Sequence, residues 1–221
     1  MTLRLLLVLS LLAAPLAHAD DECRLTLGRG WPPATENYGT AVEKLFANGA
    51  APALALTRLP TTGTESGLLL IPGSGDGDWT LRSVQADQRV HYWAGAELQL
   101  RVDQEPEVNE APIPAAVALR LVADWRKALG AAVPEDQPAQ FSEDETWLFV
   151  VADPRRPGQT LRVSGTQPGC EIGERLREQI DLLIEASDEG ETKRERRWRQ
   201  LERSLDELRR ALPAIASTGQ E

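Results

Sequence analysis

The chain has few of the side chains that enzymes most often use for chemistry. Its 221 residues include only two histidines, two cysteines and one methionine. His18 belongs to an N-terminal targeting segment, so a Ser-His-Asp arrangement would have to use His91. No G-x-S-x-G motif surrounds any serine. One histidine and two cysteines also make a poor ligand set for zinc. We therefore predict no catalytic residue, no metal and no cofactor.

The chain also lacks a hydrophobic run long enough to span a membrane. The longest, Leu5 to Leu16, has about 12 residues, whereas a spanning helix needs roughly 20. Arg4 precedes this run and Ala17-His18-Ala19 follows it, which is typical of a secretory signal peptide. No cysteine directly follows Ala19, so we expect no lipid anchor. The prediction is that residues 1–19 are removed and that the mature protein lies in the periplasm, with no transmembrane segment.

Only Cys23 and Cys170 are present, and no C-x-x-C motif occurs. In an oxidising compartment an even pair predicts one disulfide. A loop this long stabilises the fold by on the order of 5 kcal/mol in the chain-entropy treatment. Two buried free thiols are the alternative.

Acidic residues outnumber basic ones. Residues 20–190 carry 28 acidic and 15 basic side chains, whereas residues 191–221 carry six acidic and eight basic. The negative body argues against nucleic-acid binding, because phosphates would be repelled. We expect the basic stretch to be the solvated face of a helix, and contact with an anionic lipid or polymer is the alternative.

The hydropathy pattern predicts an α+β fold in which helices cover a mostly antiparallel sheet. Strands are expected at 23–27, around 54–56, and at 67–71, 79–84, 89–93, 97–102, 146–151 and 161–163, the fourth to sixth forming a meander. Helices are expected at 38–48, 114–129, 172–183 and 191–212. Residues 20–170 are predicted to form an α+β domain closed by the disulfide, and residues 171–221 a helical hairpin or short coiled coil.

The last helix has an apolar seam with alternating spacings of three and four residues, which is the pattern of a coiled coil. The seam consists of Trp198, Leu201, Leu205, Leu208 and Leu212. It covers barely more than two heptads, so we favour packing on the preceding helix of the same chain. Pairing with a second chain, giving a weak dimer or a partner-binding helix, is the alternative. Pro213 is expected to end the helix.

Tryptophan is well represented in a chain that is only 5% aromatic. Trp125 and Trp147 fall on apolar faces of a predicted helix and strand, so we expect both in the core. Trp31 and Trp93 are less constrained by the pattern. We therefore predict Trp31 and Trp93 as candidates for an exposed recognition surface.

Parts of the chain resemble uncharacterised secreted proteins of Gram-negative bacteria. The similar stretches are Leu56-Thr57-Arg58-Leu59-Pro60, residues 121–125, Trp147-Leu148-Phe149 and Gly158-Gln159-Thr160. This resemblance implies no activity and no site residues. From the residues alone, we expect a non-catalytic periplasmic protein, a monomer or weak dimer, that binds a protein or other cell-envelope component. A periplasmic small-molecule binder and a hydrolase using His91 or a carboxylate pair are the alternatives.

Overall fold

A computed structural model describes residues 27–75, 77–166 and 171–216. The strands are β1 (Leu27–Arg29), β2 (Leu54–Leu59), β3 (Ser66–Ile71), β4 (Trp79–Gln85), β5 (His91–Ala94), β6 (Glu97–Leu100), β7 (Glu107–Ile113), β8 (Thr146–Ala152) and β9 (Thr160–Thr166). The helices are α1 (Glu36–Ala47), α2 (Ala115–Ala132), α3 (Glu171–Asp188) and α4 (Glu191–Ala216).

Seven strands form one antiparallel sheet in the order β1-β9-β8-β2-β3-β4-β7. Strands β5 and β6 pair only with each other, as a separate antiparallel hairpin. Side chains alternate across the sheet, so each strand contributes to both faces. The α+β architecture predicted from the hydropathy pattern is therefore confirmed.

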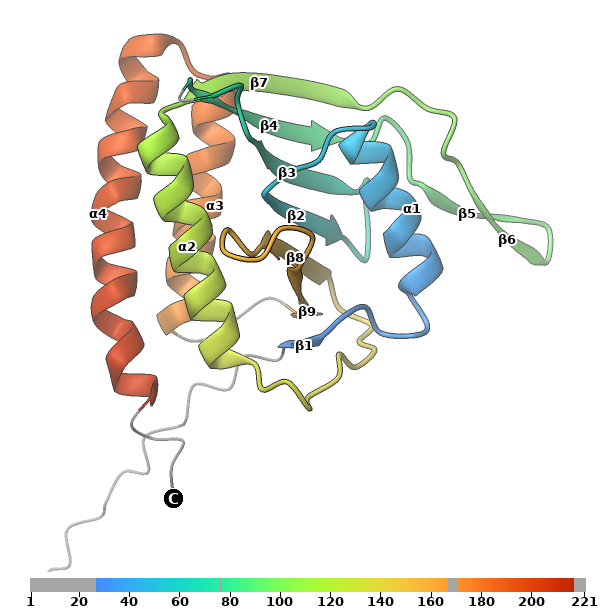
Figure 1. Cartoon of the computed structure of the whole chain (residues 1–221). Helices are drawn as coiled ribbons and strands as arrows, with labels where there is room; N and C mark the ends of the chain where they lie inside the picture. Colours follow the sequence, from blue (N-terminus) through green and yellow to red (C-terminus); the bar gives the residue numbers. More distant parts are fainter. Residues whose placement is uncertain (1–26, 76, 167–170, 217–221) are drawn as a thin grey trace, which may run out of the picture.

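The helices cover the two faces unequally (Figure 1). On one face, α2 and α3 pack against the sheet, and α4 packs outside them. On the other face lies α1, with the β5–β6 hairpin projecting beside it. Among the described helices, none combines the length and the apolar composition that a membrane crossing requires.

Each face has its own buried cluster. The larger one joins sheet residues such as Leu56 and Phe149 to apolar side chains of α2, α3 and α4. The smaller one lies under α1 and includes Val42, Phe46 and Leu148. Because the larger cluster runs without a break from the sheet to α4, the C-terminal hairpin is part of this core.

Three details differ from the sequence-based expectation. Strands 79–84, 89–93 and 97–102 do not form one meander: β4 pairs instead with β7, which places Trp79 opposite Ile113, and the β5–β6 hairpin leaves the sheet. The pattern missed β7 because Glu107, Asn109 and Glu110 interrupt its apolar residues and because it includes Pro112, which an edge strand tolerates. Helix α2 also passes Gly130, and α4 passes Pro213 to end at Ala216.

The predicted signal peptide and both cysteines lie outside the described residues, as does most of the strand expected at 23–27. The predicted disulfide between Cys23 and Cys170 therefore stays a prediction. The strand after Cys23 is β1 and the strand before Cys170 is β9, and these two strands are hydrogen-bonded neighbours. That pairing is compatible with the predicted bridge.

Candidate functional site

The apolar seam of α4 is buried inside the chain. Its five members are at most 8% exposed and belong to the same cluster as the sheet: Trp198, Leu201, Leu205, Leu208 and Leu212. Helices α3 and α4 pack as a pair, which is the arrangement favoured from the sequence. A partner helix could reach this seam only by displacing α2 and α3.

Polar contacts fix α4 to α2 as well. The Asp124 carboxylate of α2 is 6% exposed and receives a hydrogen bond from Arg209 Nε of α4 at 2.8 Å. Its other oxygen lies 3.5 Å from Arg120 Nε, and Arg120 also pairs with Asp206 of α4. Arg209 of the basic stretch thus helps to hold the helix layer together.

A chain of hydrogen bonds crosses the helix layer between its apolar contacts. Trp125 Nε1 donates to Gln179 Oε1 at 2.6 Å, and Gln179 Nε2 donates to Ser204 Oγ at 3.3 Å. Ser204 Oγ in turn donates to Glu178 Oε2 at 2.9 Å. One tryptophan and three polar side chains therefore specify how α2, α3 and α4 meet.

The two tryptophans proposed for recognition have different environments. Trp31 is only 8% exposed, so the prediction that it is an exposed residue is wrong. Its ring packs directly on Gly39 of α1, where a Cβ would lie 2.4 Å from the indole, and its Nε1 donates to Glu43. Trp93 is 68% exposed and lies on β5. Trp125 and Trp147 are buried, as predicted.

Trp93 belongs to an apolar face of the β5–β6 hairpin, which we call the hairpin face. Strand pairing places His91 opposite Leu100 and Trp93 opposite Leu98, so these four side chains share one side. By the same alternation, Val102 continues this side beyond β6. Four large apolar side chains on this face are exposed: Trp93, Leu98, Leu100 and Val102. An exposed apolar surface of this kind marks an interaction site in soluble proteins.

The base of the hairpin is tied to the body by a buried carboxylate, Glu65. This side chain is fully buried, and its Oε2 accepts a hydrogen bond from the Val90 amide at 2.9 Å. Its Oε1 accepts a hydrogen bond from the Tyr38 hydroxyl of α1. Burial and this hydrogen bond raise the pKa of Tyr38. One acidic side chain therefore connects the hairpin, α1 and the loop between β2 and β3.

His91 packs into the same junction. Its ring meets Tyr38 edge-on at 4.6 Å, and its Nδ1 accepts a hydrogen bond from Arg89 Nε at 3.3 Å. Arg89 also donates to the carbonyls of Pro60 and Thr61. Burial, and then the charge of Arg89, lower the pKa of His91, with Glu65 opposing them. The neutral imidazole is thus favoured as a structural contact.

A groove lies between α1 and the segment that follows β6. It has a volume of about 700 Å³ and is lined by Val102 and Gln104 on one side and by α1 residues, including Ala41, Lys44 and Leu45, on the other. Val102, the last residue of the hairpin face, therefore lines this groove as well.

Within 27–75, 77–166 and 171–216, no three His, Asp, Glu or Cys side chains are grouped so that they could hold a metal ion.

The sequence pattern pointed to Trp93 but not to the residues that position its hairpin. A glutamate such as Glu65 in a Thr/Gly-rich stretch looks solvated, and only the tertiary structure shows that it is buried.

Comparison of the chain with protein-family models, with curated proteins and with solved structures finds no match.

Proposed function

We propose that this protein is a non-catalytic periplasmic protein that binds a protein component of the cell envelope through the hairpin face. The observation that carries the proposal is Trp93, a 68% exposed tryptophan beside Leu98 at 51%. Tryptophan is among the residues that contribute most of the binding energy in protein interfaces. The predicted signal peptide supplies the compartment.

The charge around the hairpin favours a protein partner with basic groups. Residues 87–107 carry five acidic and two basic side chains. An anionic lipid surface would repel such a segment, whereas a protein with a basic rim around an apolar centre would complement it. Electrostatic attraction of this type weakens with salt.

The hairpin is suited to this task because it is held at its base and free at its tip. Glu65, Arg89 and His91 fix its first residues against the body. On the opposite side of the hairpin, Arg101 stacks over Tyr92 at 4.3 Å, which stiffens the two strands. A pre-positioned apolar face loses less conformational entropy on binding than a flexible loop.

In this proposal α4 stabilises the fold and does not bind the partner. Its seam lies in the core, and deletion of residues 191–221 would leave apolar surface of α2 and α3 uncovered. Such a deletion would report on folding as much as on binding. The test therefore uses point substitutions on the hairpin.

The experiment is affinity purification of the tagged protein from periplasmic extracts, with quantitative mass spectrometry of what co-purifies. Four proteins are compared: the wild type, Trp93→Ala, Leu98→Glu and the control Leu119→Glu. Leu119 is 52% exposed on α2, so it matches Leu98 in exposure on the opposite face. We expect one protein that is enriched with the wild type and the control and lost at least ten-fold with both hairpin variants.

The same purification at 0.1 M and 0.5 M NaCl should show less of that protein at the higher salt concentration. Circular dichroism checks that all four proteins are folded. Equal enrichment with all four, or no enriched protein with the wild type, would overturn the proposal.

A further inference from the structure

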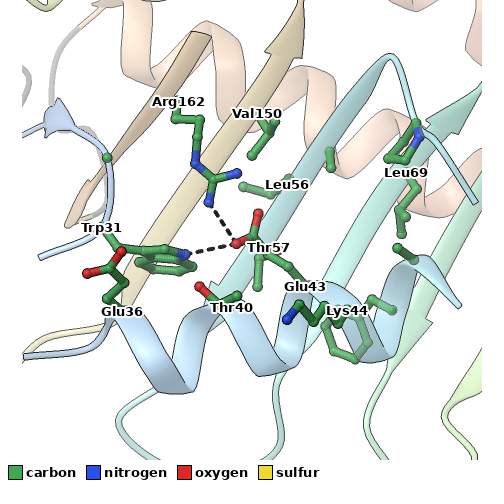
Figure 2. Close-up of a pocket in the computed structure, with 15 residues that line it drawn as sticks. Trp31, Glu36, Thr40, Glu43, Lys44, Leu56, Thr57, Leu69, Val150 and Arg162 are labelled. Atoms are coloured by element: carbon green, nitrogen blue, oxygen red, sulfur yellow. Dashed lines mark hydrogen bonds and ion pairs between the residues drawn. The ribbon is translucent and has the colours of Figure 1, made fainter. Parts of the chain in front are cut away.

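A second concave site lies under α1, on the side away from the hairpin. Its volume is about 530 Å³, within the range of small-molecule sites. The cavity is bounded by α1, by the segment at Gly30 and Trp31, and by strands β2, β3, β8 and β9 (Figure 2). It belongs to neither the helix layer nor the hairpin face.

Most of the cavity wall is apolar. The sheet contributes Ala55, Leu69 and Val150, and α1 contributes Phe46 and Ala47. Helix α1 has only 12 residues, and its packing is centred on Val42 and Phe46. It therefore leaves the surface between Val150 and Arg162 partly uncovered.

The polar end of the cavity is built around Glu43. Its Oε2 accepts two hydrogen bonds, one from Trp31 Nε1 at 2.9 Å and one from Arg162 Nη2 at 2.8 Å. Figure 2 shows the indole and the guanidinium converging on this carboxylate from two different segments. Because Glu43 is held by both donors, it in turn fixes the position of the Arg162 side chain.

The Arg162 guanidinium, although it is bound to Glu43, still has N–H donors that can bind another group. Arginine carries five N–H donors, and the bond to Glu43 uses one of them. Arg162 is 38% exposed, so its remaining donors can be reached from the cavity. Lys44 and Glu36 also line the cavity, one of each charge, so Arg162 is the group that favours an anion there. Arginine in a fixed orientation is the residue best suited to a carboxylate or another planar anion.

We infer that this cavity binds a small amphipathic molecule with an apolar chain and a single carboxylate-type anionic group. The chain lies against Ala55, Leu69 and Val150, and the anionic group accepts hydrogen bonds from Arg162. Glu43 is a positioning residue, since it orients the guanidinium and does not contact the chain. This site is independent of the proposed protein partner.

The test is isothermal titration calorimetry of the full mature protein with three probes of equal chain length: decanoate, decanol and decyltrimethylammonium. The two ionic probes are used below their micelle concentrations, and decanol is used below its solubility limit. We expect decanoate to bind, decanol to bind at least ten-fold more weakly, and decyltrimethylammonium to bind most weakly. Equal binding of all three, strongest binding of the ammonium probe, or no binding of decanoate would overturn the inference.

Variants locate the binding and separate it from the hairpin. Arg162→Gln should weaken decanoate at least ten-fold while leaving decanol unchanged, and Val150→Phe should fill the cavity and abolish both. The control Arg199→Gln removes an exposed arginine from α4 and should bind like the wild type. Trp93→Ala should also bind decanoate normally, so failure of the hairpin proposal and failure of this one are distinguishable. An Arg162→Gln variant that is folded and binds decanoate as tightly as the wild type would contradict the assigned anion contact.

Discussion

The two faces of the sheet differ in how completely they are covered. On one face, α2, α3 and α4 form two helical layers, and their apolar side chains are joined to the sheet in one cluster. On the other face, the single helix α1 covers a smaller cluster and leaves a cavity on one side and a groove on the other. The helix-covered face carries most of the buried core, and the α1 face is the one to which we assign binding in both proposals.

The exposed apolar side chains follow the same division. The helix layer exposes Leu119 and Ile184 as separate residues, which is ordinary for a protein surface. The hairpin exposes four apolar side chains on one face, where strand pairing holds them together. The two faces are distinguished by whether their exposed apolar side chains are grouped together, and less by how exposed any one of them is.

The largest loss of stability should come from a substitution at Trp125 on the helix-covered face. This side chain is fully buried and donates to Gln179. Its replacement by alanine should lower the free energy of unfolding by about 3–5 kcal/mol, because it leaves a cavity and removes the donor to Gln179 Oε1. Urea denaturation measures the loss. Trp93→Ala is the matched control and should change stability by less than about 0.5 kcal/mol. Equal losses for the two variants would contradict the division between the faces.

A smaller loss is expected at the attachment of α4 to α2. Asp124→Asn removes the charge that Arg120 and Arg209 share and should cost about 2 kcal/mol, the scale of hydrogen bonds to charged groups. The control Asp181→Asn changes an exposed residue of α3. Urea denaturation should separate the two variants. If Asp124→Asn is as stable as the control, the ion pairs do not hold the helix layer.

On the α1 face, Glu65→Gln should act locally. The amide group of glutamine can still accept from Tyr38 through its oxygen, but its NH2 group then faces the Val90 amide. We expect hydrogen exchange at residues 90–101 to quicken by a factor corresponding to about 1–3 kcal/mol of local stability. Amides of α2 should keep their wild-type protection. Unchanged exchange in the hairpin would show that Glu65 does not hold its base.

The smallest effect concerns pH. The folded protein lowers the pKa of His91, so protonation favours the unfolded chain. Stability from this group is complete above the unfolded pKa of about 6.5 and is lost as the pH falls from there toward the folded pKa. Urea denaturation between pH 7.5 and 5.5 should show the decline. His91→Phe keeps a ring against Tyr38 and should flatten it. An equally steep decline in this variant would assign the effect to other groups.

Much of the helix-covered face could be predicted from the sequence. The spacing of Leu201, Leu205 and Leu208 predicts a buried seam, and the structure buries all three. Trp125 lies on the apolar face of a long helix, and Trp147 lies in the most hydrophobic strand. In such elements, hydrophobic periodicity and burial agree, because each helix meets one continuous apolar surface.

The α1 face was less predictable because its structure depends on single tertiary contacts. Trp31 lies in a stretch whose sequence predicts a loop. It is nevertheless buried, because its ring packs on Gly39 of α1 and its Nε1 donates a hydrogen bond to Glu43. Glu65 stands in a turn-rich stretch, and its burial depends on Tyr38 and Val90. Nothing in the sequence pattern predicts the ion pair between Arg162 and Glu43, because these residues are 119 positions apart.

The most direct test of the division between the faces is photo-crosslinking in living cells with benzoylphenylalanine placed at Trp93 or at Leu119. Both positions expose a large apolar side chain, on the α1 face and on the helix layer respectively. We expect irradiation to give a discrete protein adduct from position 93 and none from position 119. An adduct from position 119 alone, or equal adducts from both, would contradict the assignment of recognition to the α1 face.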